Sequence, residues 1–294
     1  MAQTLTEIKA ILAAHGLHPK HKFGQNFLHD GNHMGRIMDA AALSAGDVVL
    51  EVGPGTGALT ERLLEADVSV VAVEIDGDLE PILRERILGL GDHAAARFAL
   101  VIDDVMAGKH GLNGEVQEAL SGQTGVSERG FKLIANLPYN VASPLLINLA
   151  KLASGSSTGA MIHAVVMLQK EVAQRIVAPP GGKDYGPLGI LLQALYDTRL
   201  VGTLSPHCFW PAPKVASAVV AMVRRASPLT PNFEGFTDLT HRLFAARRKQ
   251  LGSILGQHVK LPKGIEPRQR PETLSVEQIA ELLALNPESF QRRP

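Results

Sequence analysis

Short apolar runs alternate with helical patterns through the first two thirds of the chain. Runs rich in Val and Ile are typical of strands buried on both faces of a parallel sheet, and a three-to-four-residue apolar period predicts helices. Alternation of the two predicts an α/β fold with a doubly wound, Rossmann-like sheet. Strands are expected at Asp47–Val52, Ser69–Ile75, Phe98–Ile102, Phe131–Ala135, His163–Leu168 and Ala216–Val223. Helices are expected at Leu59–Ala66, Asp78–Leu90, Ser143–Leu152, Lys170–Val177 and Pro187–Tyr196.

The pattern changes after Arg225, where Pro-rich turns lead into helical periodicity. Helices are predicted at Phe236–Leu255 and Ser275–Leu285, with Ser275 as an N-cap. We therefore expect a catalytic α/β domain in residues 1–225 and a small helical domain in residues 226–294. A segment rich in Gly, Ser, Gln and Glu, residues 108–130, is expected to be an insertion on the surface.

Composition narrows the class of protein. A chain of 294 residues with 45% hydrophobic and 20% charged residues is typical of a folded globular protein. Cys208 is the only cysteine, so an intramolecular disulfide is excluded and a reducing cytoplasm is expected. The N-terminus lacks a signal pattern, and no apolar run reaches the length of a membrane helix. Nothing in the sequence indicates an obligate dimer, so a monomer is expected.

A glycine-rich turn follows the first predicted strand. Glu51 lies near the end of that strand, and Gly53, Gly55 and Gly57 lead into a helix. Glycine permits the sharp turn and the close approach of a cofactor. The same spacing fits the loose motif of dinucleotide-binding enzymes, so the turn alone leaves NAD and S-adenosylmethionine both open.

Acidic residues at the ends of three successive strands favour S-adenosylmethionine. Glu51 is placed to organise the turn and to face the cationic methionine end of the cofactor. Glu74 follows at the position from which a carboxylate binds ribose hydroxyls. Asp103 or Asp104, after the third strand, is expected to accept the adenine amino group.

The fourth strand runs into Asn136-Leu137-Pro138-Tyr139, which matches the (Asn/Asp)-Pro-Pro-(Tyr/Phe) type of motif in methyltransferases that modify exocyclic amines. Asn136 Oδ1 and the Leu137 carbonyl can accept hydrogen bonds from an adenine N6, a weak nucleophile. Pro138 stiffens the loop, and Tyr139 offers a face on which an extruded base stacks. Phe209 is a candidate for the other face of the base, or alternatively a core residue.

With these motifs, the sequence resembles the ribosomal RNA adenine dimethyltransferase family over nearly its whole length. The segment KHKFGQNFLHD, residues 20–30, is similar to the opening motif of that family. The resemblance favours Asp104 over Asp103, because Asp-Val-Met here matches Asp-Ala-Met in the family. Residue reasoning and resemblance together give an expected cofactor-binding set of Asn26, Leu28, Glu51, Gly53, Gly55, Glu74, Asp104 and Asn136.

The resemblance implies the substrate: two adjacent adenines in a hairpin loop near the 3′ end of small-subunit rRNA, each dimethylated at N6. The chain departs from the family at Tyr185–Gly189, where Pro187 replaces an expected arginine. Three rivals stay open. The first is the related class that methylates large-subunit rRNA and confers antibiotic resistance, and the second is a non-catalytic RNA-binding assembly factor on the same fold. The third is an NAD-dependent dehydrogenase.

The formal net charge is zero, but residues 199–294 carry 14 Lys and Arg against 7 Asp and Glu. A basic end of this kind can bind phosphate locally. His29 and His33 are spaced like metal ligands on a helix, yet no third ligand is evident and methyl transfer needs no metal, so no metal site is expected. Candidate RNA contacts, with a solvated surface as the alternative, are Lys20, Lys22, Arg242, Arg247, Arg248 and Lys249.

Overall fold

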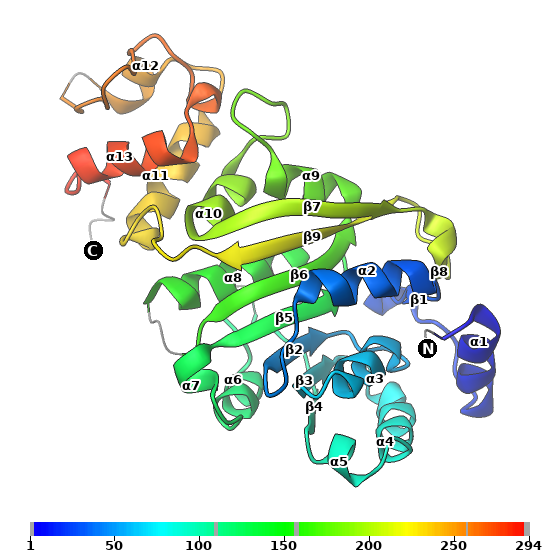
Figure 1. Ribbon diagram of the computed structural model, residues 1–294. Coiled ribbons are helices and arrows are strands. Elements are labelled where there is room, and N and C mark those ends of the chain that lie inside the picture. The colour runs from blue at the N-terminus through cyan, green and yellow to red at the C-terminus, as the bar shows by residue number, and fades with distance from the viewer. Residues whose placement is uncertain (1–2, 109–110, 156–158, 257, 291–294) are drawn as a thin grey trace.

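The computed structural model describes residues 3–108, 111–155, 159–256 and 258–290 (Figure 1). Its centre is a seven-stranded sheet of order β4-β3-β2-β5-β6-β9-β7, in which β2 to β6 are parallel and β9 is antiparallel to both neighbours. The strands are β2 Val48–Val52, β3 Ser69–Glu74, β4 Phe98–Ile102, β5 Phe131–Asn136, β6 Met161–Gln169, β7 Tyr196–Leu204 and β9 Ser217–Arg224.

The six expected strands are confirmed to within two residues at each end. The sequence pattern missed β7, which forms one edge of the sheet and exposes polar residues such as Asp197 and Arg199. An edge strand has neighbours on one side only, so it need not show a continuous apolar run. The apolar runs were typical of strands in a parallel sheet, but β9 differs from the others because it inserts antiparallel between β6 and β7.

Helices cover both faces of the sheet (Figure 1). Successive residues of β5 face opposite sides of the sheet: Leu133 belongs to one hydrophobic cluster and Ile134 to another. The Ile134 side is covered by α2 Gly31–Ala41 and α3 Ala58–Glu65. The Leu133 side is covered by α6 Gly114–Ser121, α8 Ala142–Gly155, α9 Lys170–Val177 and α10 Pro187–Leu195. Short helices η2 Gly77–Leu79, α4 Glu80–Leu88 and α5 Asp92–Ala95 connect β3 to β4.

The segment expected to be a surface insertion is instead the crossover between β4 and β5. Residues 109–110 lie outside the described ranges, but the rest forms α6 and α7 Val126–Arg129. Val116, Leu120 and Val126 are buried in the main hydrophobic cluster. The i, i+4 spacing of Val116 and Leu120 was the helical signal that the polar composition obscured.

The C-terminal segment forms α11 Phe233–Ala245, α12 Leu251–Leu255, η4 Pro271–Thr273 and α13 Val276–Leu285. The predicted helix Phe236–Leu255 is therefore broken at residues 246–250. The break lets the Arg247 guanidinium donate to the Gly182 and Lys183 carbonyls and to the Glu272 carboxylate. Ser275 caps α13 as predicted, in a capping box with Gln278.

One hydrophobic cluster runs from the sheet into these C-terminal helices, through Phe236, Leu239 and Ile279 among others. Tyr185 is fully buried and donates from its hydroxyl to the Leu274 carbonyl at 2.8 Å. The C-terminal helices thus share a core with the sheet, and a separate domain beginning at residue 226 stays a prediction.

The N-terminal segment lies at the opposite side of the molecule from α12 and α13 (Figure 1). It comprises α1 Leu5–Ala14, η1 His21–Phe23 and β1 Phe27–Leu28. β1 pairs antiparallel with β8 Phe209–Trp210, which follows η3 Pro206–Cys208. Within the described ranges, no helix is both long and apolar enough to cross a membrane.

Candidate active site

A cavity lies where the carboxyl ends of β2, β3, β4 and β5 meet. Ligands bind at this edge of open α/β sheets, because the loops after parallel strands converge there. The N-terminal segment from Lys22 to Leu28 forms a further wall. The cavity therefore combines strand-end loops with a segment that precedes the sheet in sequence.

The glycine turn shapes one wall of this cavity. Gly53, Gly55 and Gly57 have φ values of 72°, 59° and 80°, a region that L-residues with a Cβ rarely adopt. A Cβ on Gly55 would also lie 3.0 Å from the Phe27 ring. The turn therefore needs glycine both for its backbone conformation and for the close approach of the N-terminal segment.

Two buried carboxyl groups lie beside the turn. Glu51 is 1% exposed and accepts a hydrogen bond from the Thr60 hydroxyl at 2.7 Å. Glu74 is 4% exposed and accepts from the backbone N–H groups of Gly55 at 3.2 Å and Asp76 at 2.9 Å. Burial raises the pKa of Glu51 to about 8, and burial also raises the pKa of Glu74.

Both acids after β4 line the cavity, but their carboxylates are used differently. Asp103 accepts from the Asp104 N–H at 2.7 Å through Oδ1 and from the Asn113 amide at 2.8 Å through Oδ2. Asp104 accepts from the Met106 N–H through Oδ1 at 2.9 Å. Its Oδ2 has no hydrogen-bond partner among the described residues, so it is the oxygen available to a ligand.

The loop after β5 brings Asn136, Leu137, Pro138 and Tyr139 to the cavity together. Asn136 Nδ2 donates to the Asn26 carbonyl at 3.1 Å. This contact orients the amide so that Oδ1 is left as an acceptor, and no described residue donates to it. The Leu137 N–H donates to the Met167 carbonyl at 3.0 Å, which anchors the loop to β6.

The two aromatic candidates are placed differently. Tyr139 lines the cavity, and its hydroxyl shares a hydrogen bond with Ser217 Oγ at 2.9 Å; burial raises its pKa. Phe209 is 3% exposed, lies opposite Leu28 in the β1–β8 pair and packs in the core on the α2 side of the sheet. Unlike Tyr139, it is not among the residues that line the cavity.

Polar contacts hold the N-terminal segment over the site. Lys20 Nζ donates to Asp76 at 2.5 Å and to Asp78, and these bonds raise the pKa of Lys20. Gln25 Nε2 donates to the second oxygen of Asp76 at 2.7 Å. Gln3 exchanges two buried hydrogen bonds with Thr56 on the glycine turn. Lys20, predicted as an RNA contact, therefore serves to anchor this segment.

The other predicted RNA contacts lie in two places. Lys22 is exposed at the cavity, with its ammonium over the Phe23 ring. The rest lie at or after the end of α11, far from α1 and β1 in Figure 1. Arg247 is engaged with Glu272 and two carbonyls, and Arg242 donates to the Ile254 carbonyl at 3.0 Å. Arg248 and Lys249 are exposed.

Several residues that line the cavity were not predicted from the sequence. Met34 and Ile37 come from α2, whose amphipathic pattern was the available signal, and Met167 comes from the end of β6. Phe27 lies inside the N-terminal motif but packs on Gly55, a contact that no spacing in the sequence indicates. The full expected cofactor-binding set lines the cavity: Asn26, Leu28, Glu51, Gly53, Gly55, Glu74, Asp104 and Asn136.

Comparison with known proteins gives a consistent result. "Ribosomal RNA small subunit methyltransferase A" of Phenylobacterium zucineum is 39% identical, covering 93% of this chain and 90% of that protein. The protein of the same name in Pediococcus pentosaceus is 37% identical, covering 92% and 91%. A solved dimethyladenosine transferase from Plasmodium falciparum shares the fold, with a TM-score of 0.72 at 22% identity, covering 90% of this chain and all of that one. A family model described as "Ribosomal RNA adenine dimethylase" matches residues 16–285, and the chain belongs to this family.

Proposed function

We propose that this protein transfers methyl groups from S-adenosylmethionine to N6 of two adjacent adenines in a hairpin loop near the 3′ end of small-subunit rRNA, which gives N6,N6-dimethyladenine. The observation that carries the proposal is the Asn136 amide. Its nitrogen is held by the Asn26 carbonyl, which leaves Oδ1 as an acceptor in a loop that lines the cavity. The small-subunit name of the relatives supports the choice of RNA.

The acidic groups of the cavity fit S-adenosylmethionine. Glu51, Glu74 and Asp104 follow successive strands, in the order suited to the cationic methionine end, the ribose hydroxyls and the adenine amino group. The free Oδ2 of Asp104 is the acceptor for that amino group. When bound, the cofactor supplies a methyl group on a positively charged sulfur, so the proposed transfer needs no metal.

The loop after β5 orients the target amine. Asn136 Oδ1 and the Leu137 carbonyl each accept a hydrogen bond from N6, which turns the nitrogen lone pair away from the ring and into the cavity. A C–N bond then forms as the S–C bond breaks, and the proton of the methylated nitrogen passes to solvent. Catalysis in this scheme depends on positioning and preorganised dipoles rather than on a strong base.

Tyr139 supplies one stacking face for the extruded base. Its hydroxyl is tied to Ser217, so the ring is held without help from the substrate. Phe209 is packed in the core in this conformation, so stacking on the other face of the base requires its ring to leave that packing.

RNA contacts in the proposal come from two regions. Lys22 lies at the cavity, and the helical domain of residues 226–294 contributes Arg242, Arg248 and Lys249. Such cations give salt-dependent, largely sequence-independent affinity for phosphate. Lys20 and Arg247 are left out because their charges are paired with carboxylates. We propose a cytoplasmic monomer that acts on a small ribosomal particle.

Methyl transfer to purified ribosomal particles tests the proposal directly. Small particles that lack the modification are incubated with labelled S-adenosylmethionine, and the modified nucleotides are mapped. We expect N6,N6-dimethyladenine at two adjacent loop positions. Label confined to large-subunit RNA would assign the protein to the resistance class, and particle binding without transfer would assign it to the assembly factors.

The two acids after β4 are expected to differ in their effect on cofactor affinity. Asp104→Ala removes a charged acceptor and should weaken S-adenosylmethionine binding by about tenfold or more. Asp103→Ala, the matched control, loses bonds only to Asp104 and Asn113 and should weaken binding less. Calorimetric titration with the cofactor measures both. Equal losses in the two variants would contradict the assignment to Asp104.

Glu51 should make the stability of the free protein fall as pH rises. Its pKa is about 8 in the folded protein against 4.5 for an unperturbed glutamate, so folding takes up a proton between these pH values. Stability from this group is therefore complete below about pH 4.5 and is lost by about pH 8. The side chain that Glu51→Gln introduces cannot ionise. The free energy of unfolding of this variant should therefore rise relative to that of the wild type by up to about 1.4 kcal/mol per pH unit in that window.

Urea unfolding at pH 5.5 and pH 8.5 measures this difference. Glu118→Gln, which replaces an exposed glutamate on α6, is the matched control. The difference in free energy of unfolding between this variant and the wild type should be the same at both pH values. If Glu51→Gln behaved like Glu118→Gln, Glu51 would be ionised in the free protein and burial would not control its charge.

A further inference from the structure

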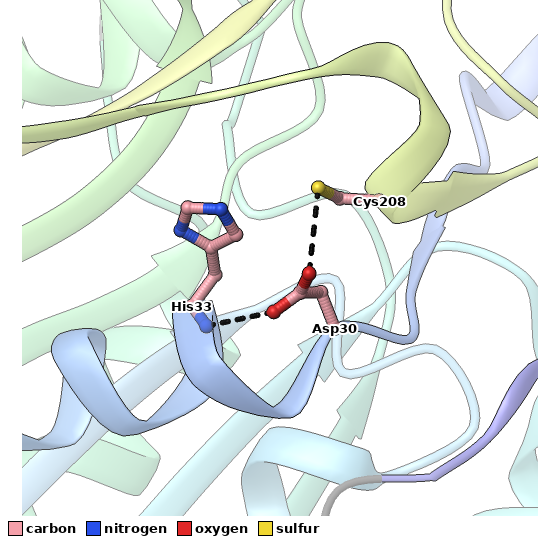
Figure 2. A group of neighbouring side chains, drawn as sticks. All are labelled: Asp30, His33 and Cys208. Atoms are coloured by element: carbon pink, nitrogen blue, oxygen red, sulfur yellow. Dashed lines mark hydrogen bonds between the residues drawn. The ribbon is translucent and has the colours of Figure 1, made fainter.

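Three metal-ligating side chains converge outside the cofactor cavity. Asp30, His33 and Cys208 each place one ligand atom within 4.8 Å of the other two (Figure 2). None of the three lines the cavity. Asp30 and His33 belong to the start of α2, whereas Cys208 ends η3, 178 residues after Asp30.

The backbone holds the two segments in this arrangement. The β1–β8 pairing aligns Leu28 with Phe209, and the His29 N–H donates to the Cys208 carbonyl at 3.0 Å. Asp30 Oδ1 accepts from the His33 N–H at 3.0 Å as the N-cap of α2. The cluster therefore sits on a ribbon and a capped helix, both fixed before any ion binds.

The two carboxylate oxygens of Asp30 have different contacts. Oδ1 caps the helix, and Oδ2 faces the Cys208 sulfur at 3.7 Å, as the dashed lines in Figure 2 show. The His33 imidazole lies beside the same space in that view. One oxygen, one sulfur and one ring nitrogen are thus directed to a common volume.

The chemistry of this set selects a particular cation. Sulfur and imidazole ligands suit Zn²⁺, whereas Mg²⁺ and Ca²⁺ prefer oxygen alone. With Zn–S of about 2.3 Å and Zn–O of about 2.0 Å, tetrahedral geometry puts the sulfur and oxygen about 3.5 Å apart. The observed 3.7 Å needs only a small adjustment. A thiolate and a carboxylate also balance the charge of the ion.

We propose that Asp30 Oδ2, a ring nitrogen of His33 and Cys208 Sγ bind Zn²⁺, with water as the fourth ligand. On binding, the thiol proton passes to solvent and the thiolate donates to the metal, with no change of oxidation state. The ion joins the segment that carries Leu28, a wall of the cavity, to the segment that carries Phe209. The site has a structural role next to the active site and no part in methyl transfer.

Calorimetric titration of the chelator-treated full chain with Zn²⁺ tests the site. We expect one Zn²⁺ per chain, with affinity reduced about tenfold or more in Cys208→Ser and in His33→Gln. His29→Gln is the matched control, since His29 lies next to the cluster but is not part of it, and it should bind like the wild type. Equal affinity in all four proteins would overturn the proposal and indicate adventitious binding to other histidines.

Co²⁺ as a spectroscopic probe separates ligation from folding. The wild type and His29→Gln should show a sulfur-to-cobalt charge-transfer band that Cys208→Ser lacks. Cofactor-induced thermal stabilisation, measured without Zn²⁺, reports whether each variant is folded. If Cys208→Ser fails to fold, the test rests on His33→Gln, because His33 is only partly buried. The assignment would be contradicted if His33→Gln kept both the intensity of the charge-transfer band and the Zn²⁺ affinity of the wild type.

Discussion

Three left-handed glycines within five residues are the constraint on which the active site depends. The φ values of Gly53, Gly55 and Gly57 let the chain reverse from β2 into α3 while its backbone stays close to the neighbouring loops. The Gly55 N–H reaches the Glu74 carboxylate, and the Phe27 ring packs on Gly55. The strands position the loops, but this turn brings β3 and the N-terminal segment to one cavity.

The N-terminal segment links the two halves of the site. Through Asp76 it is attached to the loop after β3, and through the Asn26 carbonyl it sets the orientation of the Asn136 amide. The proposed cofactor wall and the proposed catalytic amide are therefore mechanically connected. A substitution in the first 30 residues should therefore alter the orientation of the Asn136 amide, although that residue lies more than 100 positions later in the sequence.

Much of this arrangement was predictable because it follows local rules. Strand ends carry the acids and the Asn136 loop, and parallel strands present their carboxyl ends at one edge. The features that the sequence did not predict depend on tertiary contacts. β7 is a half-exposed edge strand, and the helix expected through Arg247 is broken at residues 246–250, where the Arg247 guanidinium contacts carbonyls distant in sequence. Cys208 meets Asp30 only through strand pairing, so the sequence spacing of His29 and His33 could not reveal the cluster.

The central claim is that the Asn136 amide oxygen orients the target nitrogen. Single-turnover methyl transfer by Asn136→Ala, measured beside the cofactor dissociation constant, tests it most directly. We expect a methyl-transfer rate at least about 100-fold below that of the wild type, with cofactor affinity kept within about tenfold. Asn140→Ala removes an exposed amide that also lines the cavity but has no proposed bond to the target nitrogen, and it should keep a near wild-type rate. A near wild-type rate in Asn136→Ala would contradict the account.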